Sequence, residues 1–178
     1  AIYPKLPMAG EAGRGQFQNI LLSMITLQHV NPSGSRVYFG TLTGGEFLHK
    51  ALIEIVQRHW IKAATIEMLG GLSEAEFTEY DFVTRTRRPA LRFERAMEIV
   101  NGHGTVSLLD GKPHVHIHLA LSFRDPDAPH GIAVIGGHCA SARAFAVEFV
   151  LTAYDGAPVS RGLDAATGLQ LWQMGEIV

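Results

Sequence analysis

The segment from residue 114 to residue 123, HVHIHLALSF, alternates strictly between two kinds of side chain. Successive side chains of a β-strand point to opposite faces. One face would carry only apolar residues: Val115, Ile117, Leu119, Leu121 and Phe123. The other face would carry His114, His116, His118, Ala120 and Ser122. A helix would scatter these histidines around its axis, so the alternation predicts a strand with one face in a core and a row of imidazoles on the other.

The spacing of the three histidines limits how many of them can bind one metal ion. Residues two apart on a strand lie roughly 6.5–7 Å apart, and residues four apart lie roughly 13 Å apart. One adjacent pair should therefore act as ligands, and a third ligand should come from a neighbouring strand. His138 is the best candidate, because Gly136 and Gly137 before it allow two backbones to approach closely. The alternative is a polar strand face with ordinary surface histidines; the row together with His138 favours a metal site.

The composition narrows the classes of protein to consider. With 178 residues, 47% of them hydrophobic and 18% charged, the chain is typical of a soluble globular domain with a sizeable core. A net charge of −2 argues against a dedicated nucleic-acid binder. The single cysteine, Cys139, excludes an internal disulfide and is expected to be a buried thiol. We find no long apolar run and no signal pattern, so we expect a cytoplasmic protein without a membrane span.

Turn residues and periodicity divide the chain into three parts. We expect an N-terminal arm over 1–35, a main domain over 36–155 and a C-terminal tail over 156–178 that packs on the domain. The predicted elements of the main domain are, in order, a strand over 36–43, a helix over 46–60, strands over 62–69 and 74–82, strands over 90–100 and 105–110, the histidine strand, and a strand over 142–154. Gly70-Gly71 should end the strand over 62–69, and Asp110-Gly111 should form a tight hairpin turn.

Two acids and one basic run are the remaining candidates for function. Glu67 interrupts an apolar run, so it is either a buried acid in a site or a solvent-facing residue at a strand end. Glu98 and His103 precede the predicted hairpin and could reach the metal region from a neighbouring strand. The run TRTRRP at 84–89 lacks the Gly-Arg-Pro core of a minor-groove hook, so it predicts a solvated turn.

Several ordered motifs resemble those of the plants-and-prokaryotes conserved domain, abbreviated PPC or PCC. They are Gly45-Glu46, Ala63-Ala64, Gly70-Gly71-Leu72-Ser73, Glu98-Ile99, the run GTVSLLDGKP at 104–113, His116-Ile117-His118 and Gly136-Gly137-His138. The resemblance covers roughly residues 36–155. It implies an α+β fold in which a curved, mainly antiparallel sheet has a helix packed on one side, assembled as a trimer. It also implies a metal site formed by His116, His118 and His138.

The chain departs from the family pattern at two positions near that site. His114 stands where the family more often has an apolar residue, which leaves its role open. Glu67 stands where a small residue is commoner, and this departure could mark a specialised pocket.

The resemblance supports different functional hypotheses. Plant members combine the domain with AT-hooks and act with DNA, but this chain has neither a hook nor a basic surplus, which argues against a nucleic-acid partner. The fold is also similar to alpha-acetolactate decarboxylase, whose zinc is held by three histidines. That similarity implies Zn²⁺ or another divalent transition metal with an open fourth position, and a lyase or decarboxylase acting on a small keto or hydroxy acid. A third hypothesis is a metal-stabilised trimer without catalysis.

The decarboxylase hypothesis assigns roles to four further residues. Glu67 or Glu98 would move the proton. Arg36 or Arg88 would hold a substrate carboxylate through two parallel hydrogen bonds.

Overall fold

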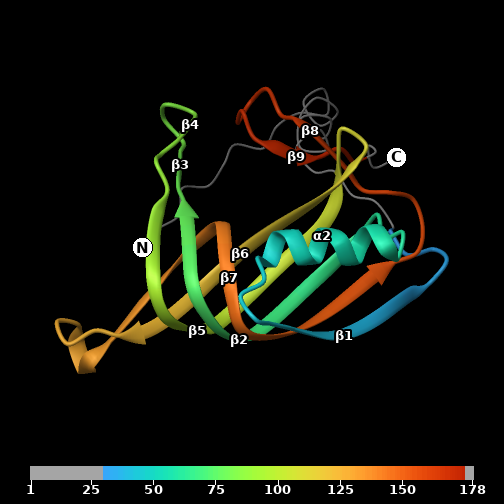
Figure 1. Ribbon diagram of the computed structural model, residues 1–178. Helices are drawn as coiled ribbons and strands as arrows, with labels where there is room; N and C mark the ends of the chain where they lie inside the picture. Colours follow the sequence, from blue (N-terminus) through green and yellow to red (C-terminus); the bar gives the residue numbers. More distant parts are fainter. Residues whose placement is uncertain (1–29, 175–178) are drawn as a thin grey trace, which may run out of the picture. The chain divides into compact units, whose positions relative to one another are not determined.

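The computed structural model describes residues 30–174, of which 30–173 form one compact unit. A mostly antiparallel sheet and one α-helix make up this part of the chain, which confirms the α+β prediction (Figure 1). The elements are β1 (Ser35–Thr43), α2 (Leu48–Arg58), β2 (Ala64–Thr78), β3 (Tyr80–Asp81), β4 (Thr86–Arg87), β5 (Leu91–Leu109), β6 (Lys112–Arg124), a 3₁₀ turn (Pro129–Gly131), β7 (Ile132–Tyr154), β8 (Ser160–Leu163) and β9 (Gln170–Trp172). Most of the predicted arm over 1–35, and the last four residues of the tail, lie outside the described residues.

The main sheet bends until four of its strands close on one another (Figure 1). Its strand order is β1-β7-β2-β5-β8-β9, and β6 pairs with both β5 and β7. The long strand β7 makes this closure possible, because residues 132–138 pair with β6 and residues 138–153 pair with β2. Every pairing in this sheet is antiparallel except that of β8 with β5, which is parallel.

Two predicted strand breaks are wrong. The strand β2 runs through Gly70 and Gly71, which were expected to end it, and β5 is one strand rather than two. Gly70 has a φ of +118°, and a Cβ there would collide with the carbonyl oxygen of Ala146 on β7. The pairing also shifts register between Met68 and Gly70. The glycines therefore form a bulge where two backbones approach closely, and not a turn.

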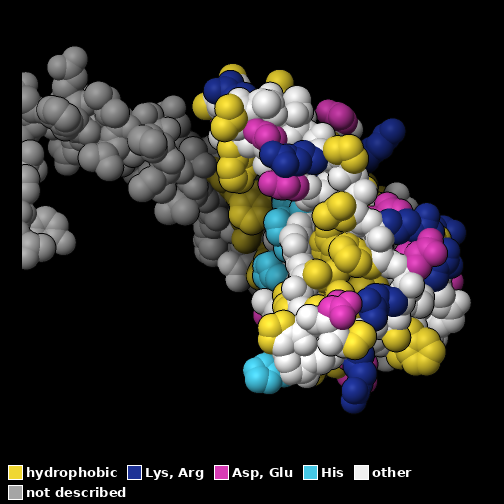
Figure 2. Space-filling view, turned by 90° about the vertical axis from the view of Figure 1, so that its left-hand side faces the viewer, with side chains coloured by type: hydrophobic (Ala, Val, Ile, Leu, Met, Phe, Trp, Pro, Cys, Tyr) yellow, Lys and Arg dark blue, Asp and Glu magenta, His cyan; other side chains and the backbone are white. Residues whose placement is uncertain are grey.

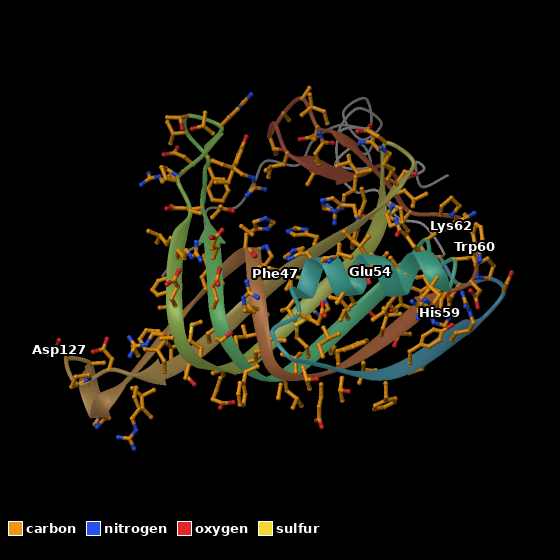
Figure 3. All side chains as sticks on the ribbon, in the orientation of Figure 1. Phe47, Glu54, His59, Trp60, Lys62 and Asp127 are labelled. Carbon is orange, nitrogen blue, oxygen red and sulfur yellow. The ribbon has the colours of Figure 1, made fainter. Side chains whose placement is uncertain are left out.

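The helix buries one face, and the histidine strand buries the face that its periodicity predicts. In α2 the buried residues are Leu48, Ala51, Leu52 and Val56, and the helix contacts β6 and β7. In β6 the alternate residues Val115, Ile117, Leu119, Leu121 and Phe123 are all buried, as predicted. Figure 3 shows Phe47 at one end of α2, His59 and Trp60 at the other, and Asp127 at the far tip of the β6–β7 connection.

Smaller predictions are also confirmed. Asp110 and Gly111 have φ values of 51° and 74°, as a two-residue hairpin turn with both central residues left-handed requires. The Cys139 thiol is buried, and burial raises its pKa to about 12. None of the helices described between residues 30 and 174 combines the length and the apolarity needed to cross a membrane.

Candidate metal centre

The pairing of β6 with β7 brings the predicted histidines to one place. His118 lies directly opposite His138, and His116 precedes His118 by two residues on the same face of β6. The glycines before His138 allow this approach. A Cβ on Gly136 would lie 2.5 Å from the Leu119 carbonyl oxygen, closer than real Cβ atoms come to backbone. The prediction of a close backbone approach is confirmed at Gly136, whereas a Cβ on Gly137 would meet only the Phe77 side chain, at 3.9 Å.

The three imidazoles converge as one metal ion would require. The candidate ligand atoms of His116, His118 and His138 all lie within 4.8 Å of one another. His116 Nε2 and His138 Nδ1 are 3.0 Å apart, and two nitrogens bound to a tetrahedral zinc ion would lie about 3.4 Å apart. Small side-chain adjustments would therefore admit the ion, and three imidazoles are a donor set that zinc accepts. We call these three residues the histidine triad. Figure 2 shows histidine side chains in a hollow beside hydrophobic ones.

Burial, followed by nearby cations and imidazoles, lowers the pKa of each histidine in the triad. Burial is the largest cause that lowers the pKa of His116 to about 3, followed by the nearby His138 and Arg161. Burial also lowers the pKa of His138 to about 4, with Arg87 as the next cause. The pKa of His118 is lowered as well, first by burial and then by Arg87. At neutral pH these imidazoles have lone pairs available for a metal and need not first lose a proton.

Two further histidines lie at the edge of the triad. The ring of His114 is 6.3 Å from that of His116, centroid to centroid. Burial lowers the pKa of His114 and of His49 in α2, and His114 is the second cause at His49. Within the described part of the chain, the buried Nδ1 atoms of His49 and His114 have no hydrogen-bond partner. The neighbourhood of the triad is therefore richer in neutral imidazole than the sequence indicated, because α2 adds His49.

Arg161 in β8 also contacts the triad, and sequence reasoning missed it. Its Nε donates to the buried Ser107 Oγ at 2.8 Å, and its Nη1 donates to the Gln170 carbonyl oxygen at 2.9 Å. Its Nη2 donates to Thr105 Oγ1 and to His116 Nδ1, both at 3.3 Å. No local pattern in the sequence marks this arginine, because only the parallel pairing of β8 with β5 brings it to the site.

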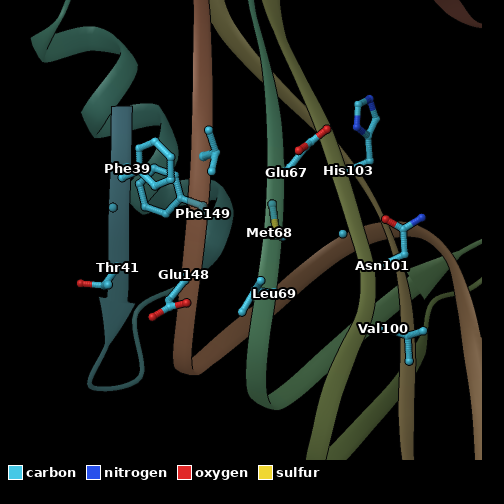
Figure 4. Close-up of a pocket in the computed structure, with 13 residues that line it drawn as sticks. Phe39, Thr41, Glu67, Met68, Leu69, Val100, Asn101, His103, Glu148 and Phe149 are labelled. Carbon is cyan, nitrogen blue, oxygen red and sulfur yellow. The ribbon is translucent and has the colours of Figure 1, made fainter. Parts of the chain in front are cut away.

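The predicted acids lie at different distances from the triad. Glu67 is exposed, which excludes the buried alternative, and it lies opposite His103, which in turn lies opposite His118 (Figure 4). Neighbouring strands are about 4.8 Å apart, so the Cα atoms of Glu67 and His118 are about 10 Å apart. Glu98 lies opposite Ser122, four residues along β6 from His118, or roughly 13 Å. The strand pairing thus places Glu67 nearer the triad than Glu98.

The two predicted substrate-binding arginines are held elsewhere by acids of the chain. Arg36 binds both carboxylate oxygens of Asp155, each at 2.9 Å, near the end of β7 that is remote from His138. Arg88 Nη2 lies 2.9 Å from an Asp81 carboxylate oxygen. Residues 84–89 are all exposed, as predicted for a solvated turn. The structure does not bring Arg36 or Arg88 to the triad.

A groove with a volume of about 820 Å³ lies on the sheet face that carries Glu67 and His103. Its lining includes the aromatic ring of Phe39, which is 82% exposed, with Leu69 and Val100 (Figure 4). Such an exposed apolar surface is unusual for a monomeric soluble protein and is typical of an interaction site.

A methyl group added at Gly136 tests how the triad is positioned. We expect Gly136→Ala to lower the free energy of unfolding by about 2 kcal/mol, because the new Cβ must push the β6 backbone away. Urea denaturation measures this change. Gly111→Ala is the matched control for the clash, since a Cβ on Gly111 would have no neighbour within 4 Å and only its φ of +74° would oppose the substitution. Equal stability of Gly136→Ala and wild type would contradict the close approach.

Comparison with known proteins agrees with this fold. The pattern of the Plants and Prokaryotes Conserved (PCC) domain matches residues 29–155. A metal-containing protein of Archaeoglobus fulgidus is 29% identical, with a TM-score of 0.71 over 84% of this chain and 98% of its own. A plant- and prokaryote-conserved protein of Pyrococcus horikoshii is 25% identical, with a TM-score of 0.69 over 80% of this chain and 94% of its own.

A third structure shares the fold. It is a candidate DNA-binding protein of Bacteroides thetaiotaomicron, 23% identical, with a TM-score of 0.68 over 78% of this chain and 92% of its own. Among curated proteins, none matches the sequence. Since the family pattern covers well over half of the sequence, this chain belongs to the Plants and Prokaryotes Conserved (PCC) domain family.

Proposed function

We propose that this protein binds zinc, or another divalent transition metal, at the histidine triad and acts there on a small keto or hydroxy acid as a lyase of the decarboxylase type. The observation that carries the proposal is the convergence of His116, His118 and His138 within 4.8 Å, all with lowered pKa. The similar protein of A. fulgidus is described as metal-containing, which supports a metal site on this fold.

The proposal assigns a role to the three histidines and to the two predicted acids. The three histidines would hold the metal as neutral ligands, and three protein ligands on zinc would leave a fourth position for water or substrate. A metal in that site would polarise a carbonyl or carboxylate oxygen of the substrate. Glu67 is the group we propose to move the proton, because the strand pairing places it nearer the triad than Glu98. Only His103, on the intervening strand, separates Glu67 from His118. Glu98 is the second candidate for that role.

Elemental analysis tests the metal site directly. We expect about one zinc or other transition-metal ion per chain in the protein as purified, or after loading with Zn²⁺ and dialysis. The loaded protein is then screened for CO₂ release from small keto and hydroxy acids. Protein that takes up no stoichiometric metal would contradict the site, whereas metal without turnover would favour a metal-stabilised structural role.

We also propose that the chain forms a homotrimer through the groove beside Phe39. Exposed apolar side chains along this face support an interface: Val37, Phe39, Leu69, Val100 and Phe145 are each more than half exposed. Burying them against further copies would remove this surface from water.

Substitution of Phe39 tests that interface. Light scattering should give three times the 19.4 kDa mass of one chain for the wild type, and Phe39→Asp should shift the protein toward monomers, because it places a charge within the interface. Phe82→Asp is the control, since Phe82 is as exposed as Phe39 (84% against 82%) but lies in the β3–β4 turn. A monomeric wild type, or a trimeric Phe39→Asp variant, would contradict the proposal.

DNA association is the competing function, favoured by the fold shared with the candidate DNA-binding protein of B. thetaiotaomicron. A net charge of −2 opposes it, and so does the ion pair that Arg88 of the basic run forms with Asp81. A gel-shift titration with duplex DNA in increasing salt separates the two. We expect no binding at about 150 mM salt; binding at that concentration with a steep salt dependence would support the DNA-associated function instead.

A further inference from the structure

Among residues 30–174, Arg161 is the one arginine that is partly buried and yet forms no ion pair. Four of them have a carboxylate oxygen within ion-pair distance: Arg36, Arg88, Arg92 and Arg143. Arg161 is half-buried, and no ion pair joins it to any carboxylate among residues 30–174. Its acceptors are two hydroxyls, one carbonyl and one imidazole, all of them neutral. Charges removed from water are normally paired, yet the part of the chain that the structure describes offers this guanidinium no counter-ion.

The contacts of Arg161 fix its position beside the triad. Ser107 and Thr105 hold one edge of the guanidinium, and the Gln170 carbonyl holds Nη1. The guanidinium also lies over the ring of Trp172, 5.6 Å from its centroid. A planar fork held in this way matches a carboxylate, which accepts two parallel N–H bonds.

The hydrogen bond between Arg161 and His116 connects this cation to metal binding. A guanidinium only donates, so His116 Nδ1 must accept and the ring proton must be on Nε2, where it can point to His138 Nδ1 at 3.0 Å. A metal on His116 Nε2 needs that lone pair. The proton of the neutral ring then moves to Nδ1 and faces the Arg161 donor. With a metal on Nε2, His116 could therefore no longer accept from Arg161, and Nη2 would be free for another acceptor.

We propose that Arg161 is the substrate-positioning residue of the metal site and that the two together bind a small carboxylate. This inference rests on the proposed metal function and replaces Arg36 and Arg88 as the carboxylate-binding groups. It also gives a function to the β8–β9 tail, which lies outside the residues matched to the family. Because the metal frees Nη2, metal and carboxylate should each strengthen the binding of the other.

Cobalt-loaded protein tests the inference, since Co²⁺ absorbs visible light and reports changes at its ligands. Pyruvate is the probe, and its uncharged amide is the control ligand. We expect pyruvate to perturb the Co²⁺ spectrum of the wild type, and Arg161→Gln to weaken pyruvate binding about tenfold or more because a charge-assisted hydrogen bond is lost. The affinity of Arg161→Gln for Co²⁺ should be unchanged or higher, because no guanidinium donor then faces the Nδ1–H of the metal-bound His116 ring.

Arg95→Gln is the matched control variant. Arg95 also lies over an aromatic ring, that of Phe123, and donates to a backbone carbonyl, but it does not contact the triad. It should bind pyruvate as the wild type does. If circular dichroism shows that Arg161→Gln is unfolded, Arg161→Lys takes its place with an expected loss of about threefold, since an ammonium lacks the planar fork.

The outcomes separate this inference from the proposed function. If Co²⁺ binds but pyruvate has no effect, or affects Arg161→Gln and wild type equally, the role of Arg161 is wrong and the metal site stands. If the wild type does not bind Co²⁺ at all, both are wrong. Equal binding of pyruvate and its amide would also overturn the role of Arg161, because it would show that charge is not recognised.

Discussion

Replacing His138 by alanine should lower the affinity of the protein for Zn²⁺ by more than about a hundredfold, since even groups that only orient metal ligands change affinity by 10–100-fold. His138 is the ligand that β7 brings to the β6 pair, with its Nδ1 3.0 Å from His116 Nε2. Without it, two imidazoles of one strand remain, and they leave a zinc ion largely bound by water. Competition with a chromogenic zinc chelator measures the change.

Two other histidines provide the comparison for this experiment. His130 is exposed in the 3₁₀ turn, and His130→Ala should bind zinc as the wild type does. His114→Ala removes an imidazole that flanks the triad without belonging to it, so most of the affinity for zinc should remain. If His138→Ala kept the wild-type affinity while His114→Ala lost it, the ligand set would be wrong.

The centre of this site could be predicted because its residues are close in sequence or carry a local signal. Strict alternation in residues 114–123 is compatible with a strand and not with a helix, so it fixed both the buried face and the histidine face of β6. The step from Gly136 to His138 indicated a backbone packed tightly against a neighbour. A limit on distance along one strand then required the third ligand to come from elsewhere.

The rest depended on contacts that no local pattern records. A glycine such as Gly70 is compatible both with a turn and with a bulge. Only the close approach of β7 decides between them. Arg161 reaches the triad through a strand of four residues that pairs in parallel with the end of β5. Conversely, the acids that hold Arg36 and Arg88 cannot be identified from the spacing of charges. Long-range pairing therefore decided which arginine lies at the site.

The same burial that prepares the triad for a metal makes the metal-free protein sensitive to acid. The pKa of His116 is about 3 and that of His138 about 4 in the folded protein, against about 6.5 in an unfolded chain. Above pH 6.5 both states are neutral and the full stability is present. Below pH 6.5 the unfolded chain binds protons that the folded protein does not bind. The free energy of unfolding therefore falls until the folded groups themselves become protonated near pH 4 to 3.

Urea denaturation of metal-free protein between about pH 6.5 and pH 5 should show this loss. Each of the two histidines contributes a slope of about 1.4 kcal/mol per pH unit, so together they lower the free energy of unfolding by up to about 4 kcal/mol over this range. His116→Phe removes one titrating ring of similar size and should reduce the slope by about 1.4 kcal/mol per pH unit. Ser122→Ala changes a residue on the same face of β6 that does not titrate, so it should keep the wild-type slope. An unchanged slope in His116→Phe would mean that this imidazole is protonated as easily in the folded protein as in the unfolded chain, and the argument for a buried, neutral ligand would fail.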